Sequence, residues 1–356
     1  MSAARRVVVA MSGGVDSSVA ASLVVERGDE AIGVTMNLAG SSSRCCSLED
    51  ADDARRVADR LGMRFYVANY RERFQREVID EFARAYLAGR TPIPCVACNQ
   101  SFKFEYLLER AKVFGASAVA SGHYARVDRD PDTGLVRLRR AVDSHKDQTY
   151  FLFGLSQAQL EAVEFPLGGM TKAEVRERAR ELGLATAEKP ESQEICFVPD
   201  GDYAGAVERA RPDALPGEGE IVDAEGRALG RHRGIHHYTV GQRRGLGIAS
   251  EKRLYVTAID AARNRVVVGG ERDLEAPVAR VEQVRWIAGA PPPAGTRADV
   301  RIRHQHAGAP ARLEPGPDAT LVRFDAPVRS VAPGQAAVFY CGDAVLGGGW
   351  IAGAAG

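Results

Sequence analysis

Residues 7–18 read Val-Val-Val-Ala-Met-Ser-Gly-Gly-Val-Asp-Ser-Ser, an apolar run followed by a glycine pair and serines. A short apolar run that ends at such a turn signal is typical of a buried strand, here Val7–Ala10. The residues that follow, Ser17–Arg27, have the pattern of a helix. This stretch therefore predicts a strand, a glycine-rich loop and a helix in direct succession.

The loop between this strand and helix has the composition of a phosphate-binding loop. Glycines let backbone N–H groups approach phosphate oxygens, and the N-terminus of the helix adds positive potential. Ser12, Ser17 and Ser18 offer hydroxyl donors, and Asp16 could hold Mg²⁺ or cap the helix. The loop lacks the lysine of a Gly-x-x-x-x-Gly-Lys-Ser/Thr motif, and it is not a Gly-x-Gly-x-x-Gly dinucleotide fingerprint.

Strand and helix patterns alternate through the first 200 residues. Further strands are predicted at Ala31–Met36, Phe65–Asn69 and Ala116–Ala120, and helices at Ser47–Leu61, Phe74–Ala88, Phe104–Phe114 and Thr171–Leu184. Thr171 and Glu174 are the expected capping pair of the last helix. This alternation predicts right-handed crossovers and a doubly wound parallel sheet, with the ligand beyond the carboxyl ends of the strands. We expect an α/β domain over residues 1–200, with a hairpin turn at Asp128–Gly134.

The pattern changes after about Gly217, where Pro and Gly become frequent and helical periods disappear. Short β-branched runs occur at Arg253–Ile259, Arg265–Val268, Ala319–Phe324 and Ala336–Tyr340. Turn signals at this spacing are typical of small barrels or sandwiches. We expect two small β-rich domains, over residues 201–272 and 273–356, the last a β-barrel, with a linker at Glu271–Pro277.

The composition excludes several classes of protein. The hydrophobic fraction of 45% and the charged fraction of 26% argue against general disorder. No apolar run approaches the roughly 20 residues that span a bilayer, and no secretory segment is visible, so we expect a cytoplasmic protein with no membrane partner. The 47 basic and 47 acidic residues balance, so a polyanion would have to meet local basic patches. Arg227–Arg253, with seven Lys/Arg against one acid, and Arg297–Arg312, with four against one, are such patches.

The six cysteines are Cys45, Cys46, Cys95, Cys98, Cys196 and Cys341. Stable structural disulfides are not expected in a reducing compartment, so clustered cysteines favour metal binding or sulfur chemistry. Cys341 ends an apolar run and is expected to be a small buried residue. Cys45 and Cys46 are expected to form a loop pair that could accept sulfur.

The loop Ser12–Ser18 resembles the PP-loop of the ATP pyrophosphatase superfamily, whose members adenylate a carbonyl oxygen. Five further motifs, in order along the chain, resemble those of the tRNA-specific 2-thiouridylases. They are Ala88-Gly-Arg-Thr-Pro-Ile-Pro-Cys-Val-Ala-Cys-Asn99, Ser144-His-Lys-Asp-Gln-Thr-Tyr-Phe151, Glu191-Ser-Gln-Glu-Ile-Cys-Phe197, Gly241-Gln-Arg-Arg-Gly-Leu-Gly247 and Pro333-Gly-Gln335. The first is expected to be a loop that its prolines stiffen and that ends in Cys-x-x-Cys. The resemblance extends over essentially the whole chain.

The resemblance implies ATP-dependent 2-thiolation of the wobble uridine, position 34, of tRNA. The C2 oxygen is adenylated, and sulfur from a cysteine persulfide replaces it, giving 2-thiouridine, AMP and pyrophosphate. Such chemistry needs a leaving group on the base and a second thiol that cleaves the S–S bond. The resemblance assigns the persulfide to Cys196 and makes Cys98 the nucleophile, with a transient disulfide between them. A cysteine desulfurase or a sulfur-relay protein would supply the sulfur, and we expect a monomer.

The resemblance also implies binding residues. The ATP site, with Mg²⁺, would comprise Ala10, Met11, Ser12, Gly13, Gly14, Val15, Asp16, Ser17, Met36 and Gly122. The tRNA and its target base would contact Ile93, Pro94, Cys95, His123, Lys146, Asp147, Gln148, Arg303, His304 and Gln335. Two positions depart from the family pattern. Ile93 stands where Asn is common, so backbone atoms would have to replace its contact with the base, and His304 stands where an aromatic residue is common.

Other interpretations of the same residues remain open. Cys95 and Cys98 have the spacing of half a zinc site, although no second pair completes it. Cys95, Cys98 and Cys196 could instead ligate three corners of an iron–sulfur cluster. A PP-loop synthetase acting on a small metabolite would explain the first domain but not the cysteine pair or the basic β modules. A non-catalytic nucleotide or iron–sulfur sensor that grips RNA is the third alternative.

Overall fold

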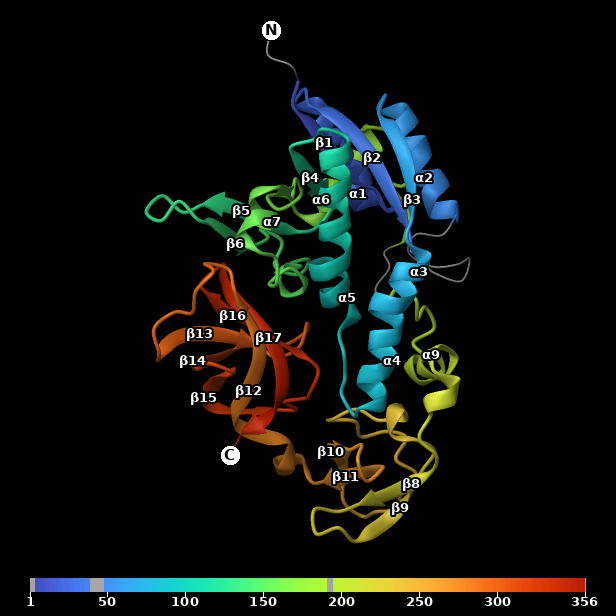
Figure 1. Ribbon diagram of the computed structural model, residues 1–356, viewed down its shortest axis with the longest axis vertical. Helices are drawn as coiled ribbons and strands as arrows, with labels where there is room; N and C mark the ends of the chain where they lie inside the picture. The colour runs from blue at the N-terminus through green and yellow to red at the C-terminus, as the bar shows by residue number, and fades with distance from the viewer. Residues whose placement is uncertain (1–3, 39–47, 191–194, 356) are drawn as a thin grey trace.

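The computed structural model of the protein describes residues 4–38, 48–190 and 195–355 (Figure 1). An α/β domain is followed by a small β module and by a closed β-barrel, as the sequence predicts. Cys45, Cys46 and residues 191–194 of the motif before Cys196 lie outside the described residues, and so does Ser47, the predicted start of the second helix. No helix in the described ranges is long and apolar enough to cross a membrane.

The first domain contains a five-stranded parallel sheet with the order β3-β2-β1-β4-β7. Its strands are β1 (Arg6–Ala10), β2 (Glu30–Asn37), β3 (Arg64–Asn69), β4 (Ala118–Ser121) and β7 (Val163–Glu164). The chain passes from β1 outward to β2 and β3 and then returns to place β4 on the other side of β1. The strand order therefore reverses beside β1, which is where a doubly wound sheet binds its ligand.

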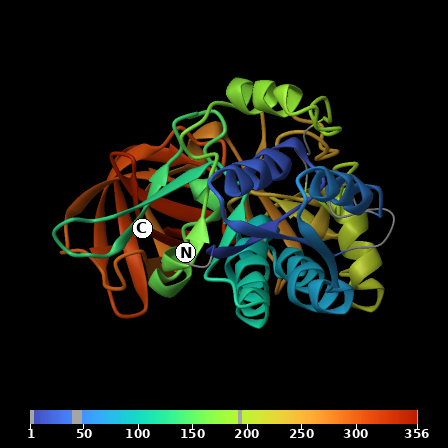
Figure 2. The ribbon, with the colours of Figure 1, turned by 90° about the horizontal axis from the view of Figure 1, so that it is seen from above.

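Alternate residues of β1 enter two different cores. Val7 and Val9 pack with α1 (Val15–Glu26), α2 (Leu48–Arg60) and α8 (Lys172–Glu181), whereas Val8 packs with aromatic residues on the opposite face. Seen from above, α1 and α6 (Phe104–Val113) lie on opposite sides of the strands (Figure 2). Burial on both faces explains why β1 is a continuous apolar run.

The helices on the second face are longer than the sequence predicts. The predicted helix Phe74–Ala88 begins earlier, at Arg71, as α3 (Arg71–Phe74), a π-helical turn (Gln75–Ile79) and α4 (Asp80–Leu87). The expected loop that ends in Cys-x-x-Cys is corrected as well. The two cysteines lie within a helix that begins with α5 (Pro94–Ala97), runs through a π-helical segment (Cys98–Lys103) and continues as α6. Pro94 takes the first helical position, where its fixed φ and missing N–H are tolerated.

The remaining helices of this half are short. They are α7 (Gln157–Glu161), α8 and the 3₁₀ turn Thr149–Phe151. The predicted capping pair of α8 is confirmed, since Thr171 and Glu174 form a reciprocal capping box.

The middle of the chain forms a four-stranded module. It comprises β8 (Gly219–Val222), β9 (Ala228–His232), β10 (Tyr255–Asp260) and β11 (Arg265–Gly269), in the order β10-β11-β8-β9. Helix α9 (Tyr203–Ala210) and the 3₁₀ turn Pro212–Ala214 precede it, and a further 3₁₀ turn, η5 (Ile235–His237), lies between β9 and β10. Ile221, Val256, Val266 and Val268 form much of its core.

The last part of the chain is a six-stranded barrel. Its strands are β12 (Glu275–Trp286), β13 (Thr296–Arg301), β14 (Ala309–Pro315), β15 (Ala319–Arg329), β16 (Ala336–Cys341) and β17 (Ala344–Ala355). The order is β12-β15-β14-β13-β16-β17, and β17 pairs back onto β12, which closes the barrel. Closure removes the free edges of the sheet.

Two expectations about this region are wrong. The predicted linker Glu271–Pro277 is a 3₁₀ turn only as far as Leu274, because β12 already begins at Glu275. Pro277 is accommodated where the register between β12 and β15 shifts, a position that does not require its N–H. Cys341 is exposed rather than buried, because it lies at the tight turn between β16 and β17.

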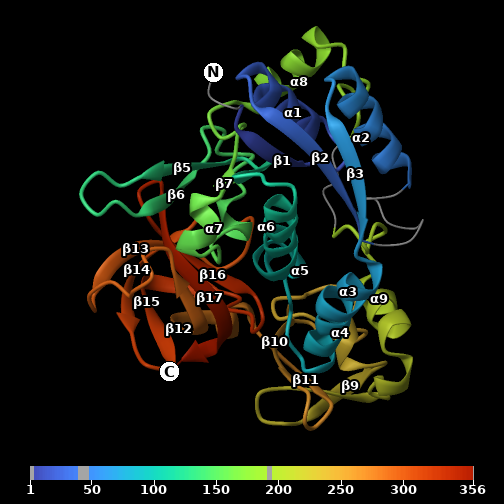
Figure 3. The same cartoon turned by 45° about the horizontal axis from the view of Figure 1, so that its top comes forward.

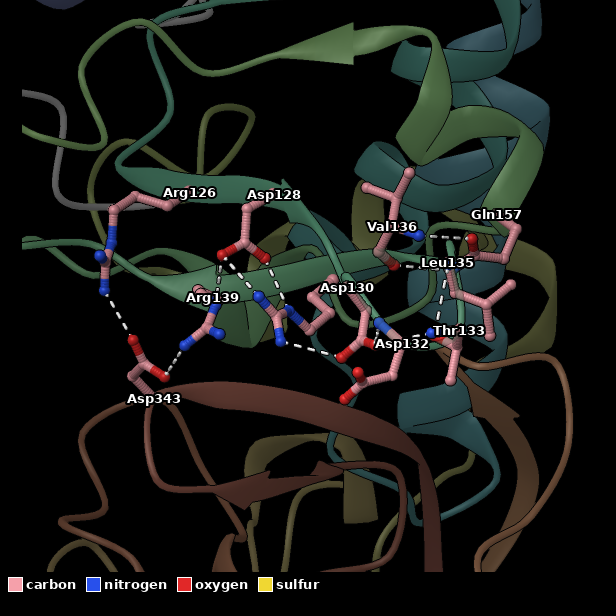
Figure 4. A network of polar contacts seen from close by, with 11 residues as sticks. Arg126, Asp128, Asp130, Asp132, Thr133, Leu135, Val136, Arg139, Gln157 and Asp343 are labelled. Atoms are coloured by element: carbon pink, nitrogen blue, oxygen red, sulfur yellow. Dashed lines mark hydrogen bonds and ion pairs between the residues drawn. The ribbon is translucent and has the colours of Figure 1, made fainter.

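A hairpin from the first domain extends the barrel. Strands β5 (Ala125–Arg129) and β6 (Val136–Arg140) flank the predicted hairpin turn, and β6 adds to β17. Asp343 receives ion pairs from Arg126 and Arg139, and Arg139 also pairs with Asp128 (Figure 4). The α/β domain and the barrel are therefore joined by a shared sheet. The helix that carries Cys-x-x-Cys lies between the barrel and α3–α4 (Figure 3).

Candidate active site

The phosphate loop is held in a tight, preformed geometry. Gly13 has a φ of +68°, and a Cβ atom there would lie 2.2 Å from the backbone oxygen of Asp50. Ser17 Oγ donates to the carbonyl of Gly14 at 3.0 Å and accepts from the backbone N–H of Ser12 at 3.2 Å. The Thr35 hydroxyl donates to the carbonyl of Met11 at 2.7 Å. These contacts fix the loop against α2 and β2 before any ligand arrives.

The end of β4 lies against this loop. A Cβ atom at Gly122 would lie 2.7 Å from both the carbonyl carbon of Asp16 and the amide nitrogen of Ser17. Met36 is buried at the end of β2. The residues expected to bind ATP thus come from the carboxyl ends of three neighbouring strands, β1, β2 and β4.

Replacing Gly122 with alanine is expected to weaken ATP binding roughly tenfold, because the methyl group must displace the start of α1 by a large fraction of an ångström. A nucleotide-binding titration measures this. Gly169→Ala is the matched control, since a Cβ there meets nothing within 4 Å. Equal affinities for the two variants would contradict the contact.

A lysine distant in sequence completes the loop. Lys172, at the start of α8, places its Nζ 2.7 and 2.8 Å from the two carboxylate oxygens of Asp16. Tyr124 donates its hydroxyl to the same carboxylate at 2.8 Å. The Lys172 side chain is only 12% exposed, so this contact is sheltered from water. Sequence reasoning missed Lys172, because no spacing links it to the loop; the capping box that places it at a helix start was the only signal.

Cys98 and Cys196 pack against the same hydrophobic cluster, although they are far apart in the sequence. The cluster includes Val8 and Phe74, and Ala10, the residue before the phosphate loop, packs against it as well. Phe197 contacts the rings of Phe74 and Phe82 edge-on at 5.9 and 5.2 Å, which anchors the chain directly after Cys196. Cys95, Cys98 and Cys196 are half-buried, and no disulfide joins any two of these three.

The barrel forms hydrogen bonds with the loop that precedes the cysteine helix. Gln335 donates from Nε2 to the carbonyl of Thr91 at 2.9 Å, and Thr91 donates its N–H to the carbonyl of Pro333 at 2.8 Å. Ile93 packs against an apolar cluster shared by the first domain and the barrel, and Pro94 is buried beside it. The Pro-Gly-Gln motif therefore holds the backbone of the segment that leads to Cys95.

The segment 146–148 lies at the junction of the α/β domain and the barrel. Asp147 is buried, accepts from the Thr149 hydroxyl and forms an ion pair with Arg301 at 3.3 Å. Gln148 exchanges two hydrogen bonds with the backbone of Tyr124, two residues after Gly122. Lys146 is half-buried at the start of this turn. The turn thus links the end of β4 to the barrel.

Three further candidate residues lie at or near this junction. Burial, with a smaller contribution from Lys103, lowers the pKa of His123 to about 3, so its imidazole is neutral at physiological pH. Its Nδ1 lies 2.8 Å from the Ser121 hydroxyl. His304 is exposed on the barrel and stacks on Phe151 with ring centres 4.5 Å apart. Arg303 beside it is also exposed.

The chain matches three family models. The tRNA methyl transferase HUP domain matches residues 5–200, the tRNA methyl transferase PRC-barrel domain residues 208–270, and the aminomethyltransferase beta-barrel domain residues 278–351.

Relatives match over nearly the full length. The chain is 51% identical to the tRNA-specific 2-thiouridylase MnmA of Solibacter usitatus, over 97% of this chain and 98% of that one. It is 52% identical to the protein of the same name from Geotalea uraniireducens, over 98% and 95%. The corresponding protein of Heliobacterium modesticaldum is 48% identical over 97% and 92%. The chain belongs to the family of the tRNA-specific 2-thiouridylases.

Proposed function

We propose that this protein is an ATP-dependent tRNA-uridine 2-sulfurtransferase that converts the wobble uridine, position 34, into 2-thiouridine. The observation that carries the proposal is the packing of Cys98, Cys196 and Ala10 against one cluster, which connects two thiols to the phosphate loop. The names of the relatives support it. We assign catalysis to residues 1–200 and tRNA binding to residues 201–272. The barrel, residues 273–356, is assigned to stabilising the site.

In the first step the uridine C2 oxygen attacks the α-phosphorus of ATP, and pyrophosphate leaves. We assign ATP to the loop Ala10–Ser17 with Met36 and Gly122. The oxygen donors of Asp16 suit Mg²⁺, which would offset the phosphate charge when bound. Lys172 lies on the same carboxylate and supplies the positive charge that the loop itself lacks. The step leaves C2 with an adenylated oxygen, a good leaving group.

In the second step the terminal sulfur of a persulfide on Cys196 attacks C2, and AMP leaves. The thiolate of Cys98 then attacks the inner sulfur and breaks the S–S bond, whose electron pair stays on the sulfur now bound to C2. The products are 2-thiouridine and a Cys98–Cys196 disulfide, which a thiol reductant reopens. A cysteine desulfurase or a sulfur-relay protein would recharge Cys196. Cys95, Cys98 and Cys196 as iron–sulfur ligands are the competing assignment.

The target base is proposed to lie against Ile93, Pro94 and Cys95. The Ile93 side chain packs into an apolar cluster, so backbone atoms of this segment would contact the base. Around it we assign tRNA contacts to His123, Lys146, Gln148, Arg303, His304 and Gln335. Asp147 is buried and ion-paired with Arg301, so we assign it to positioning the turn that presents its neighbours.

Arg243 and Arg244 support a tRNA-binding role for the middle module. Both are exposed, and within the described residues neither forms an ion pair, whereas Arg227 of the same module pairs with Asp223. Unpaired guanidinium groups are available to phosphates.

Changing Arg243 and Arg244 together to alanine is expected to weaken tRNA binding about tenfold. It should also make the slope of log affinity against log salt concentration shallower by roughly two. Filter binding over a range of salt concentrations measures both quantities. Arg227→Ala, which removes a paired arginine, should change little. An unchanged salt slope in the double variant would contradict the assignment.

The experiment that tests the function compares pyrophosphate release with and without tRNA. Stimulation by a tRNA with an unmodified wobble uridine, and not by a tRNA already thiolated, supports it. Pyrophosphate release at the same rate with and without tRNA would favour a synthetase acting on a small metabolite. We further propose that a cytoplasmic monomer grips one tRNA, which sedimentation of the complex tests.

A further inference from the structure

Three potential metal ligands converge where α9 meets the middle module. Glu208 of α9 and His236 and His237 of η5 each offer one ligand atom, and these atoms all lie within 4.8 Å of one another. The Glu208 Oε1 atom lies 3.3 Å from His236 Nε2 and 3.4 Å from His237 Nε2. One carboxylate oxygen thus faces two imidazole nitrogens.

His236 is buried, and the backbone at Gly234 leaves room for its imidazole. The His236 side chain is 2% exposed, and its Nδ1 has no hydrogen-bond partner in the part of the chain that the structure describes. Gly234 has a φ of +152°, and a Cβ there would lie 2.5 Å from His236 Cε1. The two imidazole rings lie 4.3 Å apart, tilted by 37°. A buried imidazole held beside a second, half-buried one is an arrangement whose cost a bound ion would offset.

The two separations between the carboxylate oxygen and the imidazole nitrogens match those around a tetrahedral ion and are long for hydrogen bonds. Metal–ligand bonds of about 2.0–2.1 Å at tetrahedral angles separate neighbouring ligand atoms by about 3.3–3.4 Å. An N–H···O hydrogen bond is most often about 2.9 Å long.

We propose that Glu208, His236 and His237 bind a divalent transition-metal ion, with water at the fourth position. Two imidazoles and a carboxylate are a donor set that suits Zn²⁺. The ion would tie α9 to the middle module. Helix α4 lies at the same joint, since its Phe82, Ala83 and Tyr86 share a hydrophobic core with Ala206 and Val207 of α9. The site therefore fixes the module that we assign to tRNA binding against the catalytic domain.

Titration of the metal-stripped, full-length protein with Co²⁺, followed by displacement with Zn²⁺, tests this site. The proposal predicts one equivalent of Co²⁺ with tetrahedral visible bands and without the sulfur-to-cobalt absorption that a thiolate ligand gives. Glu208→Gln and His237→Gln, both at partly exposed positions, should each weaken this equivalent at least tenfold. The matched controls are Glu218→Gln, an exposed acid of the same module, and Cys98→Ser.

The outcomes separate the possibilities. Loss of the equivalent in Glu208→Gln and His237→Gln, with retention in both controls, supports the site. Loss only in Cys98→Ser, or no stoichiometric binding to the wild type, overturns it. Thermal unfolding gives an independent readout: Zn²⁺ should raise the midpoint of the wild type by several degrees and leave that of Glu208→Gln unchanged. An equal shift in both proteins would also overturn the proposal.

Discussion

Replacing Cys196 with serine is expected to lower tRNA thiolation by at least about a thousandfold and to leave ATP binding intact. A serine hydroxyl cannot carry a persulfide, so no sulfur reaches C2. The phosphate loop does not depend on this thiol, because its geometry is fixed by Gly13, Ser17 and Thr35. Mass spectrometry of digested tRNA measures 2-thiouridine, and a nucleotide titration measures ATP affinity.

Two other cysteine variants sharpen this result. Cys341→Ser is the control, because this exposed thiol lies on the barrel at the β16–β17 turn, and it should retain full activity. Cys98→Ser should also lose thiolation but keep a persulfide on Cys196, which intact-protein mass spectrometry detects. Thiolation by Cys196→Ser at an appreciable rate would remove that residue from the sulfur path.

Changing Asp16 to asparagine is expected to slow adenylation about a hundredfold. The carboxylate is the shared acceptor of Lys172 and Tyr124, so its loss releases the lysine that the structure brings to the loop. Lys172→Met should have an effect of similar size. Because the two groups act as a unit, the double variant should be little worse than either single one. Pyrophosphate release measures all three.

Arg178→Ala is the matched control for these variants. Arg178 lies on the same helix, α8, and pairs with Glu26 and Glu181 at the surface. Its removal should leave adenylation within about twofold, since exposed ion pairs contribute little. Normal pyrophosphate release by Asp16→Asn, or additive losses in the double variant, would refute the coupling.

Local signals predicted the first domain well. The apolar run of β1, the glycine loop and the capping box of α8 each depend on neighbouring residues, and all three were placed correctly. The helix around Cys95 and Cys98 was missed because the Pro92–Pro94 pair indicates a loop, whereas packing between two cores extends the helix to Pro94. Tertiary packing overrode local propensity there.

Long-range pairings could not be read from the sequence. The sequence of β6 does not predict that it pairs with β17, and the sequence of β17 does not predict that it pairs with β12 to close the barrel. Cys341 was misplaced for the same reason, because an apolar run predicts burial but not the exposed turn that ends it. From the sequence, the candidate site could be predicted only as a set of separate motifs. That Lys172 reaches Asp16, and that Gln335 clasps Thr91, are facts of the folded chain.

Reconstitution of the reaction without iron tests the central claim most directly. Iron-free protein, ATP, Mg²⁺, a persulfide donor and unmodified tRNA are combined under strictly anaerobic conditions, and the digested nucleosides are read by mass spectrometry. The account predicts 2-thiouridine at the wobble position without added iron. If 2-thiouridine appears only after iron–sulfur reconstitution, Cys98 and Cys196 are ligands of the cluster, which contradicts the persulfide mechanism. No thiolated nucleoside under either condition would contradict the proposed function itself.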